Sequence, residues 1–450
     1  MQFMTGVATS SVLPISLLSC QKNTARGPFP YLAPTSEDNL VLAKGLSYKV
    51  TISWDDIINP NGDKFGFNND YIACLSYQGR ADEALMWVNH EYVNGMFVSN
   101  SKRGETKSKK QVDIERKSLG GSILKIKKDK NGSWTHDKTS KLNKRLDATS
   151  KIPLISKRAI KDKMIVEGTM GGCAGGVTPW GTVLSCEENV NHYYGDQWHK
   201  NKPREEGRMQ WEKFYNNPPE HYGWVVEVDL ETGKAKKQTS LGRFAHESAT
   251  VVKLSDDRVV VYSGDDAAGE HLYKFIGSKP NTLEDGELFV ADTTNGKWLS
   301  LDINKSKKLQ SVFKDQTEVL TYCREASKLL GATPLDRPED IEIHPQTGDV
   351  FVTLTNNKDK LNFYGSILKL SEQKANHESM TFTSSTFISG GEESGVSAPD
   401  NLVFDKNGNL WVATDMSGRF LNKYPYSKFK NNGLFYIPMS GEFAGQAFQV

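Results

Sequence analysis

The feature that most constrains this chain is a short pattern that recurs along it: a turn, four to six strand-like residues, and then acidic or amide residues. It occurs at residues 83–91, 180–189, 257–266, 348–357 and 408–415. The copies are roughly 60 to 100 residues apart, which leaves room for further strands between them, and such strands are visible at 223–229, 271–276, 286–292, 365–370 and 433–438. Many short strands in degenerate repeats are typical of a β-propeller. A β-sandwich is the alternative, but it needs about half as many strands.

The composition agrees with this prediction and excludes several classes of protein. The 450 residues carry 56 Lys and Arg against 55 Asp and Glu, a net charge of +1, whereas a dedicated nucleic-acid-binding domain is strongly basic. The apolar content of 37% is too high for a wholly disordered chain. Residues 315–330 are the clearest helix candidate in a chain that otherwise lacks the 3.6-residue apolar period. We therefore predict an all-β protein.

The first residues differ from the rest of the chain. Residues 1–20 carry no charge, but Pro14 interrupts them and they are too short for a good membrane-spanning helix. Residues 2–14 resemble the stretch that follows a twin-arginine motif, and residues 17–20 resemble a lipobox, in which Cys20 becomes the lipidated first residue. We predict an export or lipoprotein-like leader over residues 1–25, with an uncleaved tail as the alternative, and a single propeller domain over residues 26–450. The protein is then periplasmic, secreted or anchored by lipid.

The acidic strand ends carry a chemical consequence. In a propeller, equivalent strands of each blade end around one axis, so their carboxylates and amides converge and repel one another unless a counter-charge is bound. Bound metal is the simplest counter-charge, and hard oxygen ligands suit Ca²⁺ or ferric iron. The candidate ligands are Asn89, His90, Glu91, Glu187, Glu188, Asn189, Asp265, Asp266, Glu270, Asn356, Asn357 and Asp415.

Three further segments contain residues suited to such a site. In GGCAGGVTPWGTVLSCEEN (171–189), four glycines flank Cys173 and its neighbour, so the backbone can approach a ligand closely and the thiolate can bind metal. GRFAHESAT (242–250) contains a His-Glu pair, and RPEDIEIHP (337–345) places Arg337 two residues before Glu339. Residues i and i+2 of a strand share a face, so Arg337 could clamp an oxyanion while Glu339 binds metal. A buried structural cysteine and surface ion pairs are the alternatives.

Together these segments resemble the PhoX-type alkaline phosphatases. The matching stretches are NHEYV (89–93), GGCAGGVTPWGTVLSCEEN (171–189), HYGWVVEVD (221–229), GRFAHESATV (242–251), YSGDDAAGEHLYKF (262–275), RPEDIEIHPQTGDVFVTLTNN (337–357) and PDNLVFDKNGNLWVATD (399–415). They cover the chain from about residue 90 to residue 415, and their length and order make the resemblance specific.

The resemblance implies a six-bladed propeller, here with irregular insertions, whose axis holds ferric and calcium ions and which hydrolyses phosphate monoesters, and some diesters, in phosphate scavenging. It implies that Cys173 is a thiolate ligand of iron and that Glu247 and Glu339 bridge iron and calcium. It further implies calcium ligands among Glu188, Asn189, Asp266, Glu270, Asp400 and Asp415. Arg337 would bind the substrate phosphate. Arg145 is a second candidate, although Lys144 replaces one arginine of the family's Asn-Arg-Arg run.

Two other functions stay open at this point. A calcium-dependent propeller lactonase or esterase also gathers acids at the axis, but it has no need of the Cys173 segment. A non-enzymatic scaffold would use calcium only for rigidity. We expect a monomer that acts on small phosphate esters and has no specific nucleic-acid partner.

Overall fold

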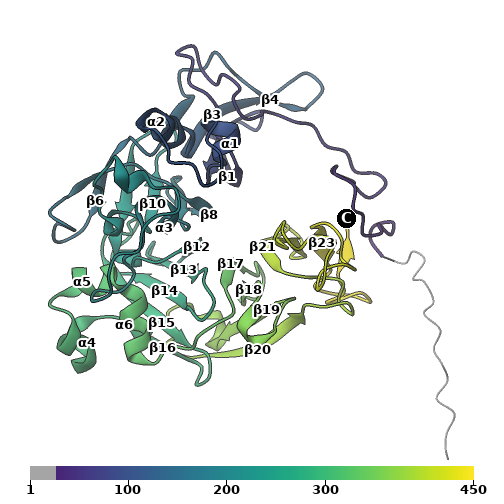
Figure 1. Cartoon of the computed structure of the whole chain (residues 1–450). Helices are drawn as coiled ribbons and strands as arrows, with labels where there is room; N and C mark the ends of the chain where they lie inside the picture. Colours follow the sequence, from purple (N-terminus) through teal and green to yellow (C-terminus); the bar gives the residue numbers. More distant parts are fainter. Residues whose placement is uncertain (1–26) are drawn as a thin grey trace, which may run out of the picture.

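The computed structural model describes residues 27–450, which form five β-sheets that follow one another around a ring (Figure 1). The first sheet contains β1 (Asn69–Ser76), β2 (Glu83–His90), β3 (Gly120–Lys128), β4 (Trp134–His136) and β5 (Lys144–Leu146). The second contains β6 (Lys151–Ile155), β7 (Ile165–Glu167), β8 (Gly172–Val177), β9 (Val183–Glu187), β10 (Val225–Val228) and β11 (Ala235–Gln238). The third contains β12 (His246–Lys253), β13 (Val259–Asp265), β14 (Leu272–Gly277), β15 (Gly286–Asp292) and β16 (Lys297–Ser300). The fourth contains β17 (Pro338–Ile343), β18 (Val350–Leu354), β19 (Ser366–Glu372) and β20 (Phe382–Ser389), and the fifth contains β21 (Pro399–Phe404), β22 (Leu410–Thr414), β23 (Leu434–Ile437) and β24 (Phe448–Gln449).

Short helices lie in the connections between these strands. They are α1 (Gly95–Val98), α2 (Lys109–Ser118), α3 (Asn191–Tyr194), α4 (Lys307–Val312), α5 (Gln316–Thr321) and α6 (Cys323–Leu330). The helix predicted over residues 315–330 is confirmed as α5 and α6, with Asp315 as the N-cap and a break at Tyr322, whose backbone is not helical. Within residues 27–450, none of these helices has the length and apolar character needed to cross a bilayer. The predicted leader and the lipidation of Cys20 lie outside the described residues.

One edge strand of each sheet lies at the centre of the molecule. We call it the first strand of that sheet, and the strand paired with it the second strand. Strands β1, β8, β12, β17 and β21 each form one edge of their sheet, and β8, β12 and β17 contact the corresponding strands on both sides in the order β1, β8, β12, β17, β21. Pairing within the sheets is antiparallel, apart from the parallel pair β6–β11. This arrangement, with side chains of neighbouring sheets packed face to face, is that of a β-propeller and confirms the predicted fold class.

The apolar core lies between neighbouring sheets. One cluster joins the first two sheets around Trp87 and Val226, the next joins the second and third around Phe244 and Phe275, and two more follow around the ring. The second, third and fourth sheets therefore bury both of their faces, whereas Val403 and Leu434 on the last sheet are exposed.

Residues 27–68 connect the last sheet to the first (Figure 1). Phe29 packs edge-on against Trp411 and Tyr436 of the last sheet, while Phe65 packs against His90 of the first. The resemblance implies six blades, but the described residues form five sheets, and within 27–68 the only strand-like pairing is a bridge between residues 57 and 64. Three prolines within residues 28–34 remove backbone donors that a ladder would need, which explains part of this difference.

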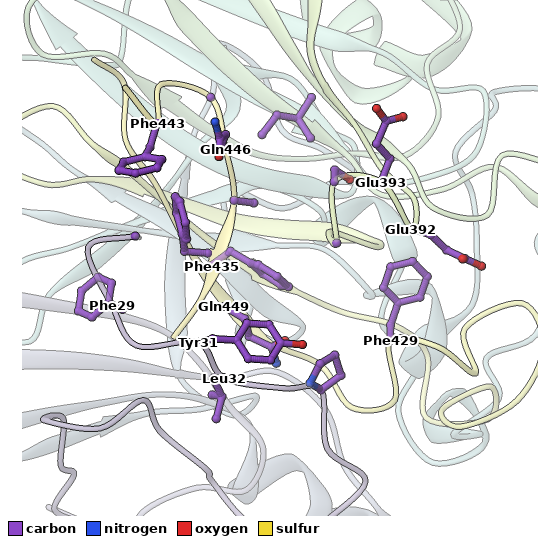
Figure 2. Close-up of a pocket in the computed structure, with 18 of the residues that line it drawn as sticks. Phe29, Tyr31, Leu32, Glu392, Glu393, Phe429, Phe435, Phe443, Gln446 and Gln449 are labelled. Atoms are coloured by element: carbon purple, nitrogen blue, oxygen red, sulfur yellow. The ribbon is translucent and has the colours of Figure 1, made fainter. Parts of the chain in front are cut away.

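Figure 2 shows a groove between residues 27–34 and the last sheet, with a volume of about 870 Å³. Aromatic side chains line it, among them Phe29, Tyr31, Phe435 and Phe443. None of its lining residues is one of the predicted metal ligands, so the groove is separate from the strand-end acids.

Gly264 on β13 allows the third and fourth sheets to approach closely. A Cβ atom there would lie 2.3 Å from the carbonyl oxygen of Pro338, so Gly264→Ala must push β17 away. We expect this change to lower the free energy of unfolding by about 1–3 kcal/mol, measured by urea denaturation. Gly418→Ala is the matched control, because Gly418 has no neighbour within 4 Å and no positive φ. Equal effects of the two changes would contradict this account of Gly264.

Candidate metal centre

One position is shared by the first strands of all five sheets. The second residue of each of these strands carries a metal-binding side chain, and we call the set the first-strand group: Asp70, Cys173, Glu247, Glu339 and Asp400. The register with the neighbouring strand shifts at four of them and directly after Glu247, which marks a β-bulge or similar irregularity. Because a bulge re-aims the side chains beside it, the same local irregularity orients all five residues.

A second position lies directly after the second strand of each sheet. We call these residues the second-strand group: Glu91, Glu188, Asp266, Thr355 and Asp415. The backbone N–H of each donates to the carbonyl two residues before its first-strand partner, over 2.7 to 3.1 Å, and the acceptors are Asn68, Gly171, Ala245, Arg337 and Ala398. One hydrogen bond repeated five times therefore fixes both groups relative to each other.

The two groups come together in space. Ligand atoms of Asp70, Glu91 and Cys173 lie within 4.8 Å of one another. The same holds for Cys173 with Glu188 and Glu247, and for Glu247 with Asp266 and Glu339. These three sets share Cys173 and Glu247, so seven members of the two groups form one continuous array around a single thiol. The remaining members, Asp400, Thr355 and Asp415, belong to none of the three sets. Acidic residues from different sheets therefore lie close together at the axis of the described chain, as the sequence predicts.

The glycine-rich segment around Cys173 is held by the neighbouring sheet. The Asn89 side chain on β2 donates to the carbonyls of Cys173 and Ala174, at 2.8 and 3.1 Å. A Cβ atom at Gly175 would lie 2.3 Å from the ring of Tyr71, and one at Gly176 would lie 2.0 Å from a backbone oxygen of β12. The glycines thus allow β1 and β12 to pack closely on both sides of β8, which brings Cys173 between Asp70 and Glu247.

Burial and mutual repulsion disfavour the charged forms of these groups. Burial first, and then neighbouring acids, raise the pKa of Asp70, Cys173, Glu188, Glu247 and Glu339. The same causes raise the pKa of Glu91 to about 7 and that of Asp400 to about 8. Such a set can be fully ionised at neutral pH only when cations lie among the oxygens.

This repulsion predicts how stability depends on pH in a sample freed of cations by a chelator. The pKa of Asp400 is 3.8 in its unperturbed state and about 8 in the folded chain, so the folded state binds more protons between those values. Its contribution to stability is complete below pH 4 and is lost as the pH rises through about 8. We expect the melting temperature of the chelated protein to fall between pH 6 and pH 9 in a thermal-shift measurement. A flat or rising profile would contradict the proposed repulsion.

Arg337 is the cation that directly contacts this array. It lies just before β17 with a φ of +58°, a left-handed conformation that turns the chain into the strand. Its Nε and Nη2 donate to Asp266 at 2.8 and 2.6 Å, and its Nη2 also donates to Glu339 at 2.6 Å. The side chain is 30% exposed, so one part of the guanidinium faces the surroundings while the other faces the acids.

Some of the candidates from the sequence have a different environment. His90 is bonded through Nε2 to Ser122, at 2.8 Å. Glu187 forms a fully buried ion pair with Lys237 at 2.7 Å, and Asp265 pairs with an arginine on α6. These residues precede the second-strand group by one position, and adjacent residues of a strand point to opposite sides. They therefore hold the strand ends in place and do not join the array.

Other predicted site residues lie at or beyond the edge of the array. Asn189 donates to Glu91 at 3.1 Å, which places its amide beside the acids. Glu270 pairs with Lys328 and belongs to none of the three ligand sets. Arg145 donates to Ser122 at 3.0 Å and to the backbone carbonyls of Lys117 and Leu119 at the end of α2, and burial lowers its pKa to about 10. The roles assigned to Glu270 and Arg145 stay predictions.

Asp70 is the ligand candidate that the sequence did not reveal. It lies at the start of β1, and the Sγ atom of Cys173 is 3.5 Å from its Oδ2. Glu91 was among the strand-end candidates but not among the residues assigned from the resemblance. Asp70 could be found only from its position. It is the second residue of its strand, as Cys173 and Glu247 are of theirs, and this becomes visible once the strand starts are aligned.

The chain is similar to several solved structures. The PhoX of Pseudomonas fluorescens, in complex with vanadate, a transition-state analogue, is 28% identical, with a TM-score of 0.82 over 94% of this chain and 88% of that one. The periplasmic gluconolactonase PpgL of Pseudomonas aeruginosa is 10% identical, with a TM-score of 0.34 over 81% of this chain and 68% of that one. An α-L-arabinofuranosidase of Clostridium thermocellum is also 10% identical, with a TM-score of 0.37 over 86% and 95% of the two chains. The last two similarities are too weak to carry an argument.

A comparison with curated proteins gave no match. The family model described as alkaline phosphatase PhoX, however, matches residues 27–448, which is nearly the whole described chain. That match has the same extent as the similarity to the P. fluorescens structure, and it includes every residue of both strand groups. The chain therefore belongs to the PhoX family of alkaline phosphatases and is a phosphoric monoester hydrolase.

Proposed function

We propose that this chain hydrolyses phosphate monoesters, and some diesters, with an iron–calcium cluster held by the first-strand and second-strand groups. The observation that carries the proposal is the array itself: buried carboxylates and one thiol, with ligand atoms within 4.8 Å, and Arg337 as the cation in direct contact. A buried concentration of acids of this kind needs further positive charge to persist at alkaline pH.

The donor set fits the proposed ions. Carboxylate and amide oxygens are the ligands that Ca²⁺ takes, six to eight at a time, and a thiolate is a softer donor that favours a transition metal. Cys173 would therefore hold iron, with Glu247 and Glu339 bridging iron and calcium. The residues left for calcium are Glu188, Asn189, Asp266, Asp400 and Asp415, and the geometry adds Asp70 and Glu91 to them. Glu270 joins this set only if its pairing with Lys328 opens.

The chain's own residues supply the remaining chemistry. When bound, the metal ions act as Lewis acids that neutralise charge on the phosphate oxygens and lower the pKa of bound water. Arg337 contributes a guanidinium whose Nη1 is left for a phosphate oxygen, while Asp266 and Glu339 hold it in place through three hydrogen bonds from Nε and Nη2. Ser185 on β9 is buried and donates to Asn89 at 2.7 Å, and the chain's proposed chemistry does not require it as a nucleophile. We infer a mechanism without a covalent serine intermediate.

Removal of calcium tests this proposal. We expect a chelator to reduce hydrolysis of p-nitrophenyl phosphate by at least about 100-fold, because the charge on the transferring phosphoryl group is no longer neutralised. Added Ca²⁺ should restore the rate, and chelator presaturated with Ca²⁺ is the control.

Metal analysis of the purified protein separates the competing functions. Iron together with calcium is the expected result, whereas calcium without iron would favour a lactonase or esterase. Hydrolysis that persists after complete metal removal would refute the proposed cluster.

We also propose that the protein is exported, as the uncharged stretch over residues 1–20 of the predicted leader (1–25) indicates, and that it acts as a monomer. Detection of the mature chain outside the cytoplasmic fraction would support export. Labelling by a fatty acid that disappears in Cys20→Ala would support lipidation.

A further inference from the structure

Helix α6 lies against the loop that joins β13 to β14. Arg324 on this helix pairs with Asp265 at one end of the loop, and Lys328, one helical turn later, pairs with Glu270 at the other. Residues i and i+4 share a helix face, so α6 presents both cations to the loop. The helix itself is fixed, because Cys323 packs in the apolar cluster of the third sheet and Ser327 donates to Tyr273 on β14 at 3.0 Å.

The Arg324–Asp265 pair is buried and bidentate. The Arg324 side chain is 9% exposed and that of Asp265 is fully buried. Arg324 donates from Nε to Oδ2 at 2.8 Å and from Nη2 to Oδ1, and its guanidinium lies over the ring of Trp198, 4.3 Å from the centroid. The backbone N–H of Ala245 donates to the same carboxylate at 3.2 Å. Both oxygens of Asp265 are thereby held in fixed positions.

Asp266, the residue after Asp265, links this fixed pair to Arg337. The backbone N–H of Asp266 donates to the carbonyl of Ala245 at 3.0 Å, so Ala245 binds both consecutive aspartates. The Asp266 carboxylate in turn accepts two hydrogen bonds from Arg337. Among the described residues, Nη1 of Arg337 makes no hydrogen bond, which leaves it available to an incoming oxyanion.

We propose that Arg324 is a positioning residue for phosphate binding: through Asp265 it fixes Asp266, and through Asp266 it sets the orientation of the Arg337 guanidinium. Arg324 makes no hydrogen bond to the ligand array or to Arg337, so its link to the guanidinium runs through these two aspartates, and its charge also acts on the Glu188 carboxylate through space. The proposal rests on the proposed role of Arg337. In this account, the helical segment between β16 and β17 serves to bring the buried Arg324 to the end of β13.

The test uses a double variant, because Arg324→Ala alone would leave a buried carboxylate without a partner and would destabilise the protein. Arg324→Met combined with Asp265→Asn removes both charges, keeps similar volumes and leaves an oxygen for the Ala245 N–H. The control is Lys274→Met with Glu372→Gln. That pair is equally buried, with side chains 0% and 1% exposed and 2.7 Å apart, but it joins β14 to β19 away from the array.

Three quantities are measured for the full chain: metal content, KM and kcat for p-nitrophenyl phosphate, and the affinity for inorganic phosphate by calorimetry. We expect the Arg324 variant to keep its metal, to show a KM at least about tenfold higher with a smaller change in kcat, and to lose phosphate affinity to the same extent. Arg324→Lys, which keeps the charge but not the two-point contact, should fall between this variant and the wild type.

The outcomes decide between a positioning role and a structural one. Unchanged KM and phosphate affinity in a folded, metal-loaded Arg324 variant would overturn the proposal, as would an equal rise in KM in the Lys274 control. Failure of the proposed function is seen separately, as a wild-type protein without metal or without hydrolysis. Calorimetry of phosphate binding still decides the role of Arg324 in that case, because it does not depend on turnover.

Discussion

Replacing Cys173 with alanine should abolish phosphate-ester hydrolysis and remove the iron from the purified protein. The Sγ atom belongs to two of the three ligand sets and is the soft donor in an array of oxygens, so no neighbour can take its place. We expect the rate of p-nitrophenyl phosphate hydrolysis to fall by at least about 1,000-fold. Iron content, measured by mass spectrometry on the same sample, should fall in parallel.

Cys186→Ala is the matched control for this change. Cys186 is a fully buried thiol on β9, the strand paired with β8, but it packs in the apolar cluster between the second and third sheets. Its removal should cost about 1 kcal/mol of stability and leave iron and rate within about twofold. A Cys173→Ala protein with full iron content and normal rate would remove the thiolate from the proposed centre.

Four members of the second-strand group, Glu91, Glu188, Asp266 and Asp415, are among the candidates from the sequence, whereas Thr355 is not, because the candidates there were Asn356 and Asn357. Glu188, Asp266 and Asp415 follow apolar strands directly, and a strand followed by an acid is a pattern that local sequence displays. The adjacent acids Glu187 and Asp265 could not be separated from them by composition. The alternation of side chains along a strand decides between neighbours, but only when the strand's end is known.

The first-strand group could not be predicted in the same way. Its members include aspartate, glutamate and cysteine, and what they share is a position at or directly before a β-bulge rather than a residue type. The segments of Cys173, Glu247 and Glu339 stand out by their residue types, and the resemblance assigns each of these residues its role. Asp70 lies in NNDYIACL, which resembles no motif, so only the aligned strand starts bring it to the site.

The number of sheets could not be predicted from local sequence alone. Residues 40–54 contain apolar stretches that suggest strands, yet in the described chain they form none. Whether an extended segment forms a ladder depends on a free neighbouring edge at the right distance, which is a tertiary property. The arrangement of α6 against the β13–β14 loop is of the same kind, since the helix was predicted but its two ion pairs were not.

Replacing Arg337 with alanine should lower kcat/KM for p-nitrophenyl phosphate by about 30- to 1,000-fold, which corresponds to about 2–4 kcal/mol of lost transition-state stabilisation. The change removes the guanidinium that would bind phosphate oxygens and leaves Asp266 and Glu339 without their hydrogen-bond donor. Metal content must be measured beside the kinetics, because those two carboxylates are proposed ligands.

The matched control is Arg258→Ala, since Arg258 also bridges two carboxylates, Asp256 and Glu378, at 2.6 Å each, but at the opposite end of β13. Arg258→Ala should leave kcat/KM within about twofold, as expected for exposed ion pairs. A metal-loaded Arg337→Ala protein with an unchanged kcat/KM would show that phosphate is bound by the metal ions without help from this arginine.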